Sequence, residues 1–137
     1  MSQVDLTFHH LGLAVHQPEK ALAFLRGLGY QCGHVVRDER QNVHLIMCTH
    51  PDAPDVEIVF PTETPGPLAG ILKDGREMIY HTCYQTSNLA AALQQLEAEV
   101  GRALCVSPAK PANLFQNEPV SFYYLEGVGL VEILESP

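Results

Sequence analysis

The sequence predicts an α+β fold in which one structural unit occurs twice. A strand pattern runs directly into an amphipathic helix pattern at residues 6–29, and the same succession returns at 78–101. A Val-Glu-Ile strand centred on Glu57 also returns, centred on Glu132. Self-similarity over a whole half of the chain indicates that both halves share one arrangement of elements. Each half therefore reads as a strand, a helix and several further strands.

The first half begins with a strand at 6–15 and continues into a helix that opens at Pro18. Proline is tolerated in the first helical turn, where its missing N–H has no partner. Gly29 suits the end of this helix. Apolar residues follow the spacing of one helical face: Ala21, Phe24, Leu25 and Leu28. We expect the remaining strands of this half at 33–38, 42–49 and 55–60.

The second half repeats this order, beginning with a strand at 78–86. Ser87 is the expected N-cap of the second helix, and Gly101 is expected to end it. The apolar face comprises Leu89, Ala92, Leu93, Leu96 and Val100. We expect the following strands at 103–107, 119–125 and 129–134.

The connection between the halves is short and apolar, so the sequence predicts one domain over residues 1–137. A first module spans about 5–62 and a second about 77–135, with a linker at 63–76 that includes one or two helical turns. The linker opens at Pro65-Gly66-Pro67 and closes at the turn Asp74-Gly75.

Composition excludes several classes of protein. The chain has 137 residues, 46% hydrophobic and 18% charged, which is typical of one globular domain. Its net charge of −8 argues against binding to nucleic acid or to an anionic membrane. There is no membrane-spanning run and no signal-peptide pattern, and the four cysteines include no C-x-x-C pair. We expect a cytoplasmic protein with reduced thiols.

The repeat also duplicates potential metal ligands. His10 matches His81 on the first strand of each half, and Glu57 matches Glu132 on the last. Two imidazoles and two carboxylates suit a divalent cation. A carboxylate in the middle of an apolar strand is costly unless its charge is compensated. The alternatives are hydrogen-bonded core histidines and glutamates that face water.

The alternation of side chains along the first strand supports the metal site. His10 shares its face with Gly12 and Ala14, which leaves space beside a ligand. The other histidines lack a repeat partner, and we interpret them as surface or supporting residues: His9, His16, His34, His44 and His50. His9 is the one rival to His10, because it lies on the opposite face of the same strand.

These segments together resemble the vicinal oxygen chelate superfamily, which includes glyoxalases, bleomycin resistance proteins and extradiol dioxygenases. They are most similar to its methylmalonyl-CoA epimerase-like branch. The matching segments, in order, are His10–Val15 with Pro18–Phe24, Gln41–Val43, Val56–Pro61, Pro67–Leu72 with Tyr80–Tyr84, and Val128–Ile133.

The resemblance implies a glyoxalase-like fold, in which two βαβββ modules form an open, cup-shaped mixed sheet around one divalent ion. It implies His10, Glu57, His81 and Glu132 as ligands of Zn, Ni, Co or Mn, and a homodimer. The ion would hold vicinal oxygens of a small-molecule substrate, while Glu57 or Glu132 moves a proton as the catalytic base.

This chain also departs from the epimerase pattern. Several relatives carry a carboxylate two residues after the segment that corresponds to Gln41–Val43, where this chain has Leu45. The family's segments near the acyl-CoA are replaced here by Lys110–Glu118 and Tyr123–Gly127. The aromatic residues that either line a cavity or pack in the core are Tyr84, Phe115, Phe122 and Tyr124.

Three functions therefore remain open. The first is an epimerase-like isomerase or lyase that abstracts a proton beside the carbonyl of an acyl thioester. The second is a glyoxalase I-type lactoylglutathione lyase, which has the same His/Glu/His/Glu ligand set. The third is a non-catalytic binding or resistance protein, although such proteins typically lack the four ligands. An extradiol dioxygenase fits less well, since its iron takes two histidines and one carboxylate.

Overall fold

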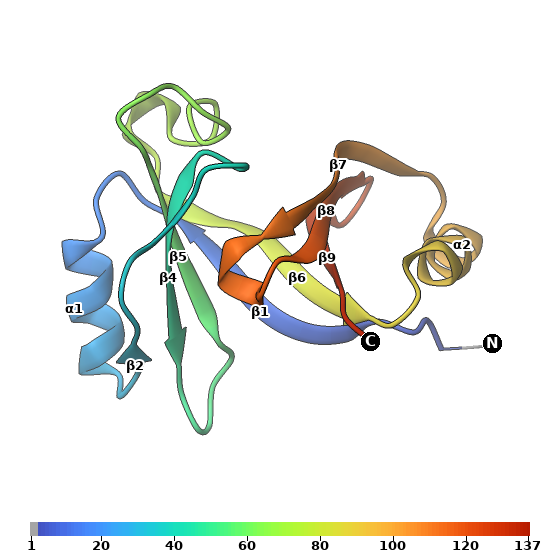
Figure 1. Cartoon of the computed structure of the whole chain (residues 1–137), viewed down its shortest axis with the longest axis horizontal. Coiled ribbons are helices and arrows are strands. Elements are labelled where there is room, and N and C mark those ends of the chain that lie inside the picture. Colours follow the sequence, from blue (N-terminus) through green and yellow to red (C-terminus); the bar gives the residue numbers. More distant parts are fainter. Residues whose placement is uncertain (1–2) are drawn as a thin grey trace. The chain divides into compact units, whose positions relative to one another are not determined.

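The computed structural model describes residues 3–137 and confirms the α+β class (Figure 1). The described residues form two α-helices, nine strands and two short 3₁₀ helices. The helices are α1 (Glu19–Gly27) and α2 (Leu89–Val100), and the 3₁₀ helices are η1 (Lys73–Gly75) and η2 (Asn113–Phe115). The strands are β1 (Thr7–Ala14), β2 (Gln31–Cys32), β3 (Val36–Asp38), β4 (Val43–Thr49), β5 (Val56–Pro61), β6 (Met78–Thr86), β7 (Ala103–Ala112), β8 (Glu118–Leu125) and β9 (Gly129–Glu135).

The chain forms two compact units, which are described separately. One comprises residues 10–80 and is called the His10 unit. The other comprises the residues up to His9 together with 81–137 and is called the His81 unit. The boundaries between the units lie within β1 and β6.

Both units have the same strand topology. In the His10 unit the order is β2-β4-β5-β1, where β5 pairs with β1 in parallel and with β4 in antiparallel orientation. In the His81 unit the order is β7-β8-β9-β6, and β9 again pairs with its first strand in parallel and with β8 in antiparallel orientation. The internal repeat read from the sequence is therefore a repeat of topology.

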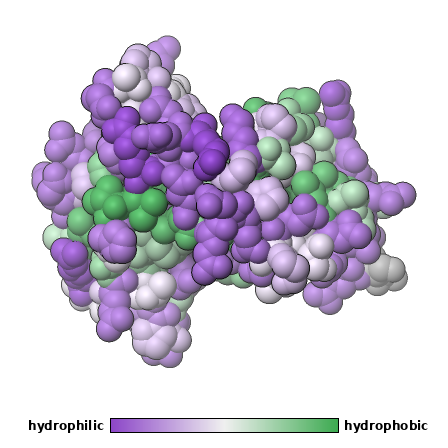
Figure 2. All heavy atoms as spheres, in the orientation of Figure 1, coloured by the Kyte–Doolittle hydropathy of each residue, from purple (hydrophilic) through white to green (hydrophobic). Residues whose placement is uncertain are grey.

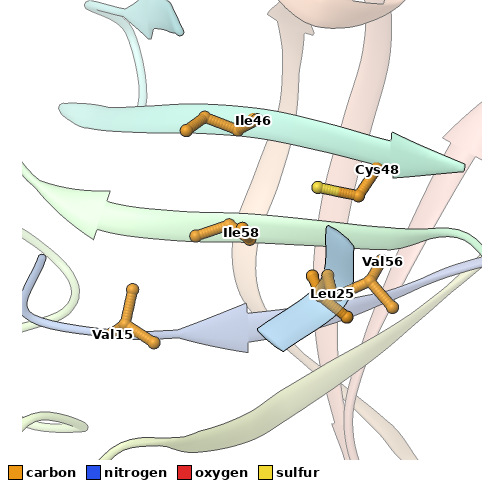
Figure 3. Packing of buried hydrophobic residues seen from close by; sticks show 6 residues of the cluster. All are labelled: Val15, Leu25, Ile46, Cys48, Val56 and Ile58. Carbon is orange, nitrogen blue, oxygen red and sulfur yellow. The ribbon is translucent and has the colours of Figure 1, made fainter. Parts of the chain in front are cut away.

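Helix α1 covers the apolar face of the sheet in the His10 unit. Leu25 is its buried residue, and Ala21 and Leu22 pack against the same cluster. Figure 3 shows the buried members of this cluster: Val15, Leu25, Ile46, Cys48, Val56 and Ile58. Phe24 and Leu28 were expected on this face, but they are 66% and 55% exposed. The expected apolar face of α1 included too many residues, because a nine-residue helix buries only a narrow stripe of side chains against the sheet.

Helix α2 packs on the sheet of the His81 unit in the same way. Leu89, Leu93 and Leu96 lie against a buried cluster that comprises Tyr123, Leu125, Val131 and Ile133. The expected face holds except at its end, where Val100 is 45% exposed. The N-cap is Asn88 and not Ser87, because the Asn88 side chain accepts a hydrogen bond from the Ala91 N–H at 3.1 Å.

Several predicted boundaries are also corrected. Of the strand expected at 33–38, only β3 at 36–38 forms, and a second short strand, β2, lies before this range; each pairs with β4. Strand β7 continues to Ala112, well beyond the expected 107, through irregularities in its pairing with β8. The linker was expected to contain one or two helical turns. It forms non-helical turns followed by the short 3₁₀ helix η1, in which Asp74 has a φ of 62°.

Much of the face seen in Figure 2 is hydrophilic, and apolar side chains gather over the unit that carries α1. Within residues 3–137, neither helix has the length and apolar character needed to cross a membrane.

Candidate metal centre

The His10 unit places one histidine beside one glutamate. In the parallel pair of β1 and β5, Glu57 lies opposite Gly12, so His10 is two residues earlier on the same face. His10 Nε2 is 3.5 Å from Glu57 Oε1. Both side chains are buried, with residue exposures of 0% for His10 and 3% for Glu57.

The His81 unit repeats this pair in the same register. Glu132 lies opposite Cys83 in the parallel pair of β6 and β9, and His81 is again two residues earlier. His81 Nε2 is 3.1 Å from Glu132 Oε1. These two residues are also buried, at 3% and 2% exposure. The duplication thus preserves the histidine, the glutamate and their relative placement.

The neighbours of each glutamate explain why it faces away from the helix. Val56 and Ile58 flank Glu57 in β5 and belong to the cluster that α1 covers. In β9, the neighbours of Glu132 are Val131 and Ile133, which pack with α2. Because side chains alternate along a strand, each glutamate projects from the opposite face.

The burial of Glu57 and Glu132 excludes the alternative in which these glutamates face water. A carboxylate removed from water costs several kcal/mol unless it is paired or bound to a cation. In both units an imidazole nitrogen lies within 3.5 Å of the carboxylate. Imidazole nitrogen and carboxylate oxygen are ligands that Zn, Ni, Co and Mn accept. Within each unit, the buried histidine and glutamate therefore have the ligand chemistry that suits a divalent metal ion.

One aromatic ring supports the histidine of the His81 unit. Phe122 lies opposite Glu132 in the pair of β8 and β9, and its ring meets the His81 ring edge-on at 5.2 Å between centroids. The equivalent position opposite Glu57 is Met47. The two pairs therefore have different surroundings even though their backbone register is the same.

The other aromatic candidates divide between packing and exposure. Tyr84 packs with the α2 cluster, and its ring lies 6.0 Å from that of Phe8, so it is a core residue. Phe115 packs against a buried cluster that contains Cys83 and Ala112. Tyr124 is 49% exposed.

The remaining histidines have local contacts within their own units. His9 packs edge-on against Phe115, at 5.2 Å between ring centroids. His44 stacks at a tilt on Phe60. His50 Nε2 contacts the Leu28 carbonyl oxygen at the end of α1. His16 donates its backbone N–H to Glu77, and His34 lies on the exposed surface.

The buried carboxylate of Asp38 was not anticipated. It is 0% exposed and accepts hydrogen bonds from the Gln41 backbone N–H at 3.0 Å and from Gln41 Nε2 at 2.9 Å. An aspartate that binds backbone groups a few residues later is a known turn former. The Asp-x-x-Gln-Asn order was the available signal for this turn.

Asn42 occupies the left-handed backbone region in this turn, with a φ of 55°. Its side chain donates to the Thr64 hydroxyl and the Pro65 carbonyl and accepts from the Thr62 hydroxyl at 2.6 Å. A cavity of about 340 Å³ lies beside this network, within the His10 unit. Asparagine tolerates this backbone conformation better than most residues, which suits it to this turn.

An exposed ion pair lies near the same turn. Arg37 donates two hydrogen bonds to the Glu63 carboxylate, at 2.9 and 3.1 Å. These bonds lower the pKa of Glu63 to about 2. Glu63 therefore keeps its negative charge at acidic pH values where an ordinary glutamate is protonated.

Comparison with known proteins agrees with this architecture. A family model described as the Glyoxalase/Bleomycin resistance protein/Dioxygenase superfamily matches residues 9–122. A search of curated proteins found no match.

Several solved structures share the fold at low sequence identity. Methylmalonyl-CoA epimerase from Mycobacterium tuberculosis is 19% identical with a TM-score of 0.80, and the match covers 100% of this chain and 93% of that one. A hypothetical protein from Bacillus halodurans is also 19% identical, with a TM-score of 0.79 and coverages of 96% and 95%. Streptomyces coelicolor methylmalonyl-CoA epimerase in complex with 2-nitronate-propionyl-CoA is 23% identical, with a TM-score of 0.71 and coverages of 96% and 98%.

The family match extends over most of the chain, and the structural neighbours have the glyoxalase-like fold expected from the sequence. The chain belongs to the glyoxalase/bleomycin resistance protein/dioxygenase superfamily.

Proposed function

We propose that this protein is a divalent-metal-dependent enzyme that removes a proton next to a carbonyl group, as an epimerase-like isomerase or lyase acting on an acyl thioester. The observation that carries the proposal is the duplicated pair, a buried histidine beside a buried glutamate at the same register in both units. A structural protein has no need to keep two such pairs, each of which is costly to bury.

The four residues His10, Glu57, His81 and Glu132 would hold one ion together, which makes the two units a single functional domain. A bound divalent cation supplies Lewis-acid chemistry, because it polarises a carbonyl and stabilises negative charge on its oxygen. Divalent metals bind imidazole in its neutral form and a carboxyl group in its ionised form.

The proton carrier is one of the two glutamates. Leu45 and Met47 lie opposite Val59 and Glu57 in the pair of β4 and β5, so no other acid occupies these positions. Either Glu57 or Glu132 would accept the proton through a carboxylate oxygen and return it to the substrate. Their buried, apolar surroundings exclude water from the transferred proton.

The structural neighbours support an acyl thioester as the proposed substrate class. Methylmalonyl-CoA epimerases have the same fold, and one was solved with 2-nitronate-propionyl-CoA. An acyl thioester is a suitable class because its carbonyl acidifies the adjacent C–H bond. The segments Lys110–Glu118 and Tyr123–Gly127 differ from the family's segments near the acyl-CoA. The proposal therefore does not specify which group is attached to the thioester sulfur.

Two measurements test the proposal. Protein purified without chelator is analysed for metal, and is then incubated with methylmalonyl-CoA in deuterated solvent. We expect about one divalent ion per chain and deuterium at the carbon beside the thioester. Glu57→Gln and Glu132→Gln should both lower the metal content, and His50→Gln is the control outside the proposed site. If both glutamate variants keep their metal, the four-residue site is wrong.

The ligand set also favours glyoxalase I chemistry as a second candidate. A His/Glu/His/Glu site serves that reaction equally well, and the substrate would be the glutathione hemithioacetal of a 2-oxoaldehyde. Turnover of this substrate without exchange into methylmalonyl-CoA would select it. Metal binding without turnover of either substrate would indicate a binding protein.

A further inference from the structure

Cys32 and Cys48 lie directly opposite each other in the antiparallel pair of β2 and β4. The next pair along is Gly33 with Met47, and the Gly33 N–H donates to the Met47 carbonyl at 2.9 Å. Hydrogen-bonded and non-hydrogen-bonded pairs alternate along antiparallel strands. The two cysteines therefore form a non-hydrogen-bonded pair, in which α-carbons are typically about 4.5 Å apart.

This arrangement matches the geometry of a disulfide bond, whose α-carbons are usually about 4.4–6.8 Å apart. Both side chains also point to the same side of the sheet. Cys48 belongs to the buried cluster in Figure 3, and Cys32 packs against that cluster. Burial, and then a hydrogen bond with Cys32, raise the pKa of the Cys48 thiol to about 12. Both residues are free thiols and face each other across the strand pair.

We propose that Cys32 and Cys48 form a redox-active dithiol, which closes into a cross-strand disulfide when it meets a small disulfide oxidant such as oxidised glutathione. This site is separate from the proposed metal centre and does not depend on it.

The reaction consists of two thiol–disulfide exchanges. Cys32 is the partly exposed member of the pair, whereas Cys48 is 0% exposed. The Cys32 sulfur loses its proton, attacks one sulfur of oxidised glutathione and expels the first glutathione thiolate. The Cys48 sulfur then loses its proton, attacks Cys32 Sγ and expels the second. The protein loses two electrons and two protons, and oxidised glutathione is reduced to two thiols.

The Cys32–Cys48 disulfide would link the short strand β2 covalently to β4. Strand β2 has two residues and follows closely after α1, so its pairing with β4 rests on few hydrogen bonds. Strand β4 also places Met47 opposite Glu57. The disulfide would therefore fasten the edge strand β2 to β4, which in turn pairs with β5, the strand that carries the proposed ligand Glu57. It would also restrict the unfolded chain between residues 32 and 48, which raises the unfolding temperature.

The other two cysteines provide internal controls. Cys105 is exposed and lies opposite Tyr123, so it has no thiol across the strand. Cys83 is 0% exposed and lies opposite Glu132. Oxidised glutathione should therefore leave a mixed disulfide on Cys105, which cannot be resolved within the chain.

The experiment incubates the full-length protein with oxidised glutathione, followed by alkylation, peptide mass mapping and thermal unfolding. We expect a peptide linked through Cys32 and Cys48, lighter by two hydrogen atoms, and an unfolding temperature raised by several degrees. Cys48→Ala should instead accumulate a glutathione adduct on Cys32. Cys105→Ser should still form the linked peptide.

Two results would overturn the proposal. One is a glutathione adduct on Cys32 of the wild-type protein that persists without passing to Cys48. The other is modification of Cys105 alone, with both Cys32 and Cys48 still alkylated as free thiols.

Discussion

Phe122 lies directly opposite Glu132 in the antiparallel pair of β8 and β9, and its ring also meets the His81 ring edge-on. One side chain thus contacts the histidine and neighbours the glutamate of the same pair. Residues that orient a metal ligand are often needed nearly as much as the ligand itself. We therefore expect Phe122 to hold the His81 ring in its orientation.

Replacing Phe122 with alanine should weaken metal binding about tenfold, within the range of roughly 10–100-fold that is typical for residues supporting a ligand. The His81 ring would lose its packing partner and sample other orientations. Isothermal titration of the chelator-treated protein with zinc measures the change. Tyr124→Ala is the matched control, because Tyr124 is an exposed aromatic residue two positions later on the same strand. Equal affinities for both variants would remove Phe122 from the site.

Removal of the metal should lower the unfolding temperature of the wild-type protein. A ligand that binds only the folded state adds about 2.7 kcal/mol at a free concentration of roughly 100 times its Kd. Scanning calorimetry with and without EDTA measures this difference. Glu132→Gln keeps the side-chain shape but loses the charge, so its transition should hardly respond to EDTA. A wild-type transition that EDTA leaves unmoved would contradict the proposed site.

Glu63 should titrate at an unusually low pH. Its pKa falls from 4.5 to about 2, first because Arg37 donates hydrogen bonds to the ionised carboxylate. The pKa is depressed in the folded state, so the contribution to stability is present above about pH 4.5 and is lost as the pH falls towards 2. Carbon-13 NMR of the Glu63 carboxyl group follows the midpoint. In Arg37→Gln the midpoint should return towards 4.5, whereas Lys20→Gln should leave it unchanged.

Gly66→Ala should destabilise the protein by about 1–3 kcal/mol, which is the usual range for forcing extra atoms into a packed site. A Cβ atom at Gly66 would lie 2.8 Å from Asn42 Nδ2 and 3.0 Å from the Asn42 carbonyl oxygen. The backbone carbonyl cannot easily move, because Asn42 is held by the threonine network. Urea denaturation measures the loss. Gly70→Ala is the control, since nothing lies within 4 Å of a Cβ atom there, and comparable losses in both variants would rule out the close contact as the cause.

Local patterns predicted most of the elements correctly. Alternating and helical periodicities placed both helices and the long strands within a few residues, apart from the end of β7, since these periods arise from the backbone itself. The wrong predictions occur where contacts with other elements decide which residue is buried or caps a helix. Phe24 looks like a core residue by spacing but is exposed, because the sheet meets only part of α1. Ser87 and Asn88 are equally good caps by type, and the turn geometry selected Asn88.

The sequence by itself determined the duplication and, with it, the histidine and glutamate of each half, because a repeated residue on a repeated element must recur at the same place in the fold. Only the tertiary structure decided that both glutamates are buried, since strand alternation alone permits either face. Tertiary structure also placed Cys32 opposite Cys48. The physical reason is that strand pairing sets the register between residues that no local pattern connects.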